Sequence, residues 1–131
     1  MRNIFDQYKQ PENRLTHALV SALEADSRLL GKFVKSVTDG NAPAAKKLKV
    51  LEQRLPGEEE PASEEEAERR GLPDAWIHDG NAWALIIESK ITSRLKKEQL
   101  ERHRRVAIRR AFSEIHLLAI VVARPIAASH Q

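Results

Sequence analysis

The chain of 131 residues contains no cysteine. Without thiols it has no disulfide framework, no thiolate zinc site and no cysteine nucleophile. A reducing compartment is the natural inference, whereas a zinc site built from histidines alone is still allowed by the composition.

Long hydrophobic runs are also missing, and the first nine residues are polar as a segment, without the apolar stretch of a signal peptide. We therefore expect a soluble, cytoplasmic protein with no membrane partner. The chain has no glycine-rich phosphate loop and no nucleophile elbow, so it does not suit hydride transfer or covalent acyl chemistry. Its length fits a single domain, residues 1–131, with a real core.

Charges of opposite sign are segregated along the chain, although the net charge is only +3. Acidic residues gather between positions 56 and 71, a proline-containing insertion that we expect to be a mobile loop or a short helix. Basic residues follow Lys90 at a density that suits a phosphate backbone, although a solvated helix face explains them equally well. These residues are Arg94, Lys96, Lys97, Arg102, Arg104, Arg105, Arg109 and Arg110.

Two helices are predicted before the acidic insertion. Pro11 and Glu12 open the first, in which apolar residues recur at three- and four-residue spacings. Asp26 can cap a second helical segment, or the two segments form one kinked helix. The remaining predicted elements are a weak strand at 49–55, strands at 75–78, 83–90 and 116–123, and a helix at 96–112.

This order predicts an α/β fold, a mixed central sheet flanked by helices. Residues 116–123 are apolar on both faces, which is typical of a central strand covered on both sides. The strands at 75–78 and 83–90 flank Asp79-Gly80-Asn81, a strong turn signal, so they should form a hairpin.

Charged residues stand at the ends of these two hairpin strands, where burial makes an unpaired charge costly. Glu88 and Lys90 share one face of their strand, because alternate residues do. A two-residue Asp79-Gly80 loop would send Asp74 and Glu88 to opposite faces. An odd-length loop or one bulge would bring Asp74 to the same face.

If they converge, Asp74 and Glu88 supply hard oxygen ligands for Mg²⁺ or Mn²⁺, with the carbonyl of Ser89 as an extra ligand. A bound ion would stabilise charge on a phosphorane and lower the pKa of its water. Lys90 would position or deprotonate that water, or neutralise the transition state. Such a set suits phosphodiester hydrolysis.

Pro73-Asp74 and Glu88-Ser89-Lys90 resemble the two halves of the motif of the PD-(D/E)XK nuclease superfamily, and the likeness extends to Glu12 and Gln99. The resemblance implies the restriction-endonuclease-like αβββαβ core. It also implies that Asp74 and Glu88 bind metal and that Lys90 is catalytic. Glu12 would complete the metal site or orient a ligand.

Further contacts are expected from the helix at 96–112. Gln99 and His103 lie one turn apart and share a face that points toward the end of the strand at 83–90 if the connection at 91–95 is short. Gln99 can then reach metal-bound water or phosphate, whereas His103 is either a nucleic-acid contact or a surface histidine. DNA is the expected partner. The candidate contacts are Arg94, Lys96, Lys97, Arg102, His103, Arg105 and Arg109, with solvated charge as the competing explanation.

The sequence therefore favours a Mg²⁺-dependent endodeoxyribonuclease. A dimeric, structure-specific nuclease of the junction-resolvase kind would use the same chemistry with one site per strand. An alternative of another class is a nucleic-acid-binding or assembly module without turnover. The intact set of Asp74, Glu88 and Lys90 argues against that module.

Overall fold

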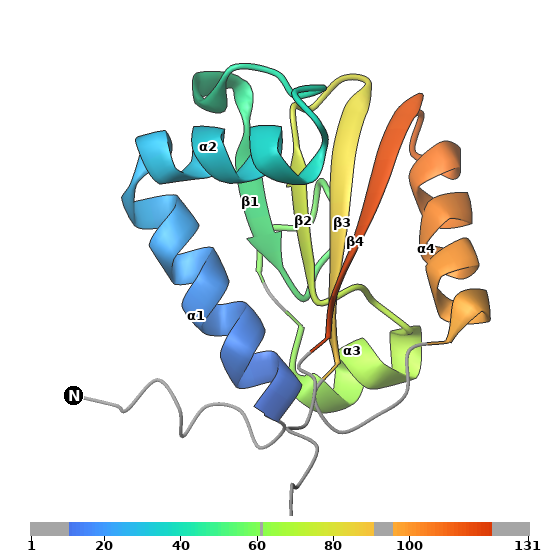
Figure 1. Ribbon diagram of the computed structural model, residues 1–131. Coiled ribbons are helices and arrows are strands. Elements are labelled where there is room, and N and C mark those ends of the chain that lie inside the picture. The colour runs from blue at the N-terminus through green and yellow to red at the C-terminus, as the bar shows by residue number, and fades with distance from the viewer. Residues whose placement is uncertain (1–10, 61, 91–95, 122–131) are drawn as a thin grey trace, which may run out of the picture.

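The computed structural model describes residues 11–60, 62–90 and 96–121, with the backbone alone at positions 11–13, 64 and 68. The chain forms an α/β structure (Figure 1). In chain order its elements are α1 (Pro11–Ala25), α2 (Ser27–Val37), a 3₁₀ turn η2 (Ala45–Lys47), β1 (Lys49–Glu52), α3 (Glu64–Arg70), β2 (Ala75–His78), β3 (Trp83–Lys90), α4 (Lys97–Arg109) and β4 (Glu114–Val121).

The four strands form one mixed sheet in the order β1-β2-β3-β4. β1, β2 and β3 run antiparallel to one another, and β4 runs parallel to β3. Parallel neighbours need a crossover, which α4 supplies between β3 and β4. The expected mixed sheet flanked by helices is thus confirmed.

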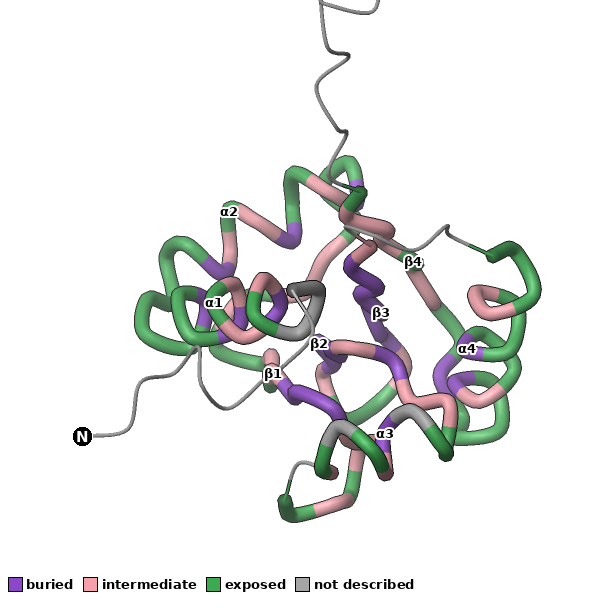
Figure 2. The backbone as a smooth tube through the Cα atoms, turned by 90° about the horizontal axis from the view of Figure 1, so that it is seen from below, coloured by how far each residue is buried: buried purple, intermediate pink, exposed green. Residues whose placement is uncertain are grey.

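Helices lie on both faces of this sheet. Viewed along the sheet, α1 and α2 lie on one side and α4 lies on the other (Figure 2). Odd-numbered residues of β3, such as Leu85, pack against α1 and α2, where Leu23 and Val34 are buried. Even-numbered residues such as Ile86 pack on the α4 side with Ala107. The period of two along β3 therefore separates the core into two layers.

The first two helices are separate elements, so the kinked-helix alternative is wrong. Asp26 lies between them in an extended conformation, and its Oδ1 accepts hydrogen bonds from the N–H groups of Arg28 at 3.0 Å and Leu29 at 3.2 Å. An aspartate in this position satisfies donors that the helix itself leaves unpaired. None of the described helices is long and apolar enough to cross a bilayer.

β4 differs from the sequence-based expectation of a central, doubly covered strand, and that prediction is wrong within the described residues. Among the described strands, β4 pairs with β3 alone and forms an edge of the sheet. Its Leu117 and Val121 are 38% and 59% exposed. An apolar run identifies a strand but does not determine how many neighbours the strand has.

The segment before β2 contains the short helix α3, one of the two alternatives expected for the acidic insertion. The weak strand expected at 49–55 is real but short, since β1 ends at Glu52 and Gln53 adopts a φ of 50°. Positive φ interrupts an extended strand, and no glycine signals this break in the sequence.

Candidate active site

The loop between β2 and β3 decides which charged residues can meet. His78 is opposite Ala84, and the N–H of Asp79 donates to the carbonyl of Trp83 at 3.2 Å, which closes a loop of three residues, 80–82. The tight two-residue hairpin is therefore not formed. Continuing the register one step beyond Ala75 and Ile87 places Asp74 opposite Glu88 on the same face.

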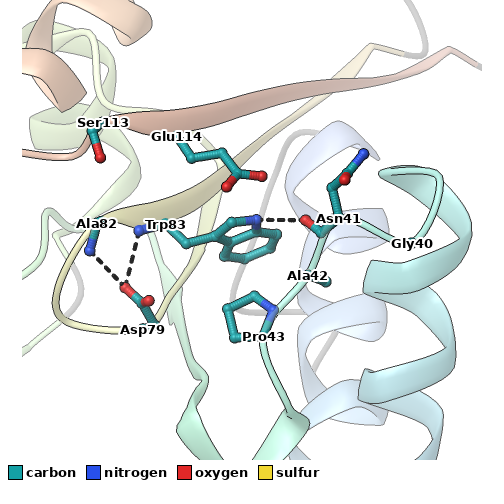
Figure 3. A pocket seen from close by; sticks show the side chains of 9 residues that line it. All are labelled: Gly40, Asn41, Ala42, Pro43, Asp79, Ala82, Trp83, Ser113 and Glu114. Atoms are coloured by element: carbon teal, nitrogen blue, oxygen red, sulfur yellow. Dashed lines mark hydrogen bonds between the residues drawn. The ribbon is translucent and has the colours of Figure 1, made fainter.

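The side chain of Asp79 explains why this loop is longer. Its Oδ1 accepts hydrogen bonds from the N–H groups of Asn81 at 2.8 Å, Ala82 at 3.1 Å and Trp83 at 3.0 Å. Figure 3 shows the last two contacts among the residues that line a pocket. The pocket has a volume of about 440 Å³ and lies beside Asp79 and Trp83, at the end of β3 remote from Glu88. Burial raises the pKa of the Asp79 carboxyl, but these backbone hydrogen bonds outweigh it and hold the pKa below its ordinary value.

Asp74 is tied directly to the end of β3. Its Oδ2 accepts a hydrogen bond from the N–H of Ser89 at 2.7 Å, and its carbonyl accepts one from the N–H of Gln53 at 3.0 Å. The preceding residue, Pro73, is buried. Asp74 thus links three neighbouring strand ends, with its carboxylate beside the backbone of the Glu88-Ser89-Lys90 segment.

Glu88 is a buried carboxylate, only 2% exposed. Nε2 of His103 lies 2.9 Å from its Oε1, and Nε2 of Gln99 donates to its Oε2 at 3.3 Å. The ammonium of Lys90 lies 3.6 Å from the same Oε2. A carboxylate removed from water is costly unless such partners compensate it, so this is a built polar site and not a strand residue buried by accident.

Ser89 points to the opposite face of β3. Its hydroxyl lies 2.8 Å from that of Thr16 on α1, and both side chains are 1% exposed. This buried contact fixes α1 to the strand that carries Glu88 and Lys90. Glu12 precedes Thr16 by one turn of α1, and Figure 1 shows this first turn at the same end of the sheet as α3. The side chain of Glu12 lies outside the described part of the chain.

The predicted nucleic-acid contacts separate into three groups. Arg94 lies outside the described residues. Exposed positions along α4 and directly before it hold Lys96, Lys97, Arg102, Arg105 and Arg109. His103 is 1% exposed and faces Glu88, so the predicted contact between His103 and nucleic acid does not fit its position. The expectation that Gln99 and His103 share a helix face directed at the end of the Glu88 strand is confirmed, since both side chains contact Glu88.

Two arginines of this basic stretch contact the acidic segment. Arg110 donates from Nη1 to the carbonyl of Pro56 at 2.6 Å, and a Cβ at position 71 would lie 2.7 Å from Nη1 of Arg102. Within the segment, Arg70 donates to Glu58 at 2.9 Å. The pKa of Glu58 is lowered by the hydrogen bond from the Leu55 N–H and then by the two cations Arg70 and Arg110, against the opposing effect of burial.

Thr16 and Gln53 are the residues near the site that the sequence did not reveal. Thr16 stands four residues after Glu12 on the buried face of α1, and this spacing was an available signal. Gln53 is 4% exposed, and its Oε1 has no hydrogen-bond partner within the described part of the chain. Only the three-dimensional pairing with Asp74 identifies Gln53, because its strand ends through a backbone angle that the sequence does not signal.

The donor set fits a hard divalent cation. Side chains at opposed positions of antiparallel strands have Cβ atoms about 4.5–5.5 Å apart, so the carboxylates of Asp74 and Glu88 can share one ion. Within the described residues no group of three or more His, Cys, Asp or Glu side chains is placed to hold a metal. Mg²⁺ commonly uses only one or two protein carboxylates and keeps several waters, so a pair of carboxylates is sufficient for it.

No family model, no curated protein and no solved structure matches this chain. Its function must therefore be inferred from the residues and their geometry.

Proposed function

We propose that the protein is a Mg²⁺- or Mn²⁺-dependent endodeoxyribonuclease. The observation that carries the proposal is the register of β2 and β3, which, continued one step beyond Ala75 and Ile87, puts Asp74 opposite Glu88. The ammonium of Lys90 lies 3.6 Å from Oε2 of Glu88. The three residue types that phosphodiester hydrolysis needs are thereby brought to one end of two adjacent strands.

The order of elements supports the finer assignment to a restriction-endonuclease-like core. A helix (α1) is followed by three antiparallel strands (β1, β2 and β3), and a crossover helix (α4) leads to a parallel fourth strand (β4). This is the αβββαβ order that the PD-(D/E)XK resemblance implies. α2 and α3 are additions before β1 and β2, and they leave the order of the core unchanged.

Each polar residue then has a role in the chemistry. Asp74 and Glu88 hold the cation, with the carbonyl of Ser89 as a further oxygen, and a bound ion supplies Lewis-acid stabilisation and a more acidic water. Lys90 orients the attacking water or balances charge that develops on the phosphate. Gln99 lies in the first turn of α4, where it donates to Glu88 at 3.3 Å and holds that carboxylate near the start of the helix. Glu12 is a further candidate ligand from α1.

The outer surface of α4 is the proposed contact for DNA. Arg105 and Arg109 are exposed there, one turn apart, and Lys97 is 89% exposed at the side chain. Residues Gln99 and His103 of the same helix face the site. One helix thus carries both the partners of Glu88 and the cations that attract phosphate.

Cleavage of supercoiled plasmid in the presence of Mg²⁺ tests this proposal. The parent protein should nick or linearise the plasmid, and EDTA should stop it. Lys90→Ala and Asp74→Ala should each lower the cleavage rate by about 100-fold or more, because each removes a group that acts on the reacting phosphate. The matched control is Lys49→Ala, an exposed lysine on β1, which should cleave at the parent rate.

The same assay separates the alternative functions. DNA binding without cleavage by the parent would contradict the nuclease and support a binding module. Retained DNA binding by the inactive Lys90→Ala protein would support a role in catalysis. A panel of linear, nicked, single-stranded and four-way-junction DNA, combined with sizing of the protein in solution, distinguishes a dimeric junction resolvase from a general endonuclease.

A further inference from the structure

His103 is an unusual residue for the inner face of an amphipathic helix. It is 1% exposed and belongs to the same helix, α4, as Ala107, which packs against Ile86 and its neighbours on the α4 side of the sheet. Its ring contacts an acidic partner instead of an apolar one, since Nε2 lies 2.9 Å from Oε1 of Glu88. A carboxylate that binds a metal ion is ionised and only accepts hydrogen bonds, so in that state Nε2 of His103 is the donor in this contact.

The two oxygens of Glu88 have different surroundings. Oε1 is directed at His103, deeper along α4. Oε2 is directed at Gln99 at 3.3 Å and at Lys90 at 3.6 Å, and both contacts are longer than the 2.9 Å contact of Oε1 with His103. Since one oxygen is held at 2.9 Å and the side chain is almost fully buried, rotation of the carboxylate would break the shorter hydrogen bond.

We infer that His103 is a positioning residue that holds Oε1 of Glu88 and so presents Oε2 to a divalent cation. The inference rests on the proposed function, because it assigns a purpose to the Glu88 carboxylate as a metal ligand. His103 itself touches neither ion nor substrate. Residues behind a metal ligand commonly orient it in this way and affect the affinity for the metal about 10- to 100-fold.

A purely structural role explains the contact less well. Replacing a buried polar or charged pair by apolar residues of similar volume is often neutral or stabilising, so packing alone gives no reason to bury an imidazole against a carboxylate. The sheet also contains a comparison residue. His78 is 6% exposed on the same face at the other end of β2, and it packs on Phe112 with ring centroids 5.8 Å apart without touching Glu88.

The test compares two substitutions of similar polarity. In His103→Gln the amide nitrogen takes about the place of Nε2 and can still donate to Glu88, whereas in His103→Asn the shorter side chain stops at about the place of Nδ1. Mn²⁺ binding to the DNA-free protein is measured by isothermal titration calorimetry. His78→Asn serves as the control for the loss of a buried histidine, and circular dichroism confirms that each variant is folded.

His103→Asn should weaken Mn²⁺ binding about 10- to 100-fold, and His103→Gln should stay within about threefold of the parent. His78→Asn should bind Mn²⁺ like the parent, because its side-chain oxygen can still accept the hydrogen bond that the Gly80 N–H donates to Nδ1 of His78 at 3.0 Å. Equal binding by parent, His103→Gln and His103→Asn would overturn the positioning role and leave the nuclease proposal standing. Failure of the parent itself to bind Mn²⁺ would overturn both.

Discussion

At the scale of single residues, the candidate site depends on side chains that hold one another in place. Asp74 accepts from the backbone of Ser89, and Glu88 contacts His103, Gln99 and Lys90. These contacts join β2, β3 and α4 at one end of the sheet. A carboxylate that is restrained before the ligand arrives loses less conformational entropy on binding, which favours tight and specific coordination.

The sequence predicted part of this arrangement correctly. Alternation along β3 placed Glu88 and Lys90 on one face, because the side-chain period of a strand is two. The face of Asp74 was left open, because Asp79-Gly80 favours a two-residue turn that would have separated the carboxylates. The three backbone N–H groups that donate to Asp79 stabilise the three-residue loop. A turn propensity for the dipeptide Asp79-Gly80 does not take these hydrogen bonds into account.

Asp79 therefore has a testable influence on the fold. Asp79→Ala should lower the free energy of unfolding by about 1–3 kcal/mol, since hydrogen bonds to a charged group are lost. Because it loosens the loop that sets the register of Asp74 and Glu88, it should also weaken Mn²⁺ binding. Chemical denaturation and calorimetry measure the two effects.

Asp79→Asn separates the hydrogen bonds from the charge. The pKa of the folded carboxyl lies below its ordinary value, so its stabilisation is present above that value and is lost as the pH falls through the folded pKa. The parent should exceed Asp79→Asn in stability at neutral pH, and the difference should shrink below about pH 4. A difference that stays constant from neutral to acidic pH would contradict this account.

At the scale of helices and strands, the periodic patterns in the sequence identified which segments are helices and which are strands. They said less about which strands lie next to one another in the sheet. The bounds of β2 and β3 agree with the residue ranges expected from sequence, since turn residues delimit both strands. β4 was expected to be central and is an edge among the strands that the structure describes. Whether a strand has one neighbour or two depends on the arrangement of the whole sheet, and the residues between Glu114 and Val121 do not determine it.

The end of α4 offers a prediction at this scale. Ala111 has a φ of 71°, and the N–H groups of Ala111 and Phe112 donate to the carbonyls of Ile108 and Ala107 at 3.0 Å and 3.1 Å. This is a helix C-terminus of the Schellman type, in which glycine normally occupies the left-handed position. Ala111→Gly should raise the free energy of unfolding by roughly 0.5–1 kcal/mol, because relief of the strained backbone exceeds the added entropy of the unfolded chain.

Thermal and chemical unfolding measure that gain. Ala107→Gly is the matched control, because Ala107 lies inside the same helix and should lose stability on the same change. Destabilisation by Ala111→Gly equal to that of the control would show that position 111 is not left-handed in solution.

At the scale of the whole molecule, charge is distributed by surface. The outer face of α4 is basic, the segment around α3 is acidic, and Arg110 and Arg70 hold that acidic segment in place. The net charge of +3 conceals this separation. The segregation of charges along the sequence predicted one acidic and one basic surface. It did not reveal which arginines form contacts within the protein.

The exposed arginines should determine how DNA binding depends on salt. Arg105→Ala and Arg109→Ala should each weaken binding about equally for different DNA sequences and reduce the slope of log K against log salt by about 1. Fluorescence anisotropy over a range of NaCl concentrations measures this slope. Arg28→Ala on α2, on the opposite side of the sheet, is the control and should leave the slope unchanged. Unchanged slopes for all three variants would place the DNA elsewhere.

The central claim is that Asp74 and Glu88 hold one divalent cation between them. Crystals soaked in Mn²⁺ and measured at a wavelength with strong manganese anomalous scattering test it most directly. We expect one anomalous peak in contact with carboxylate oxygens of both residues, and its loss in crystals of Asp74→Ala. A peak at any other place, or no peak at millimolar Mn²⁺, would contradict the account.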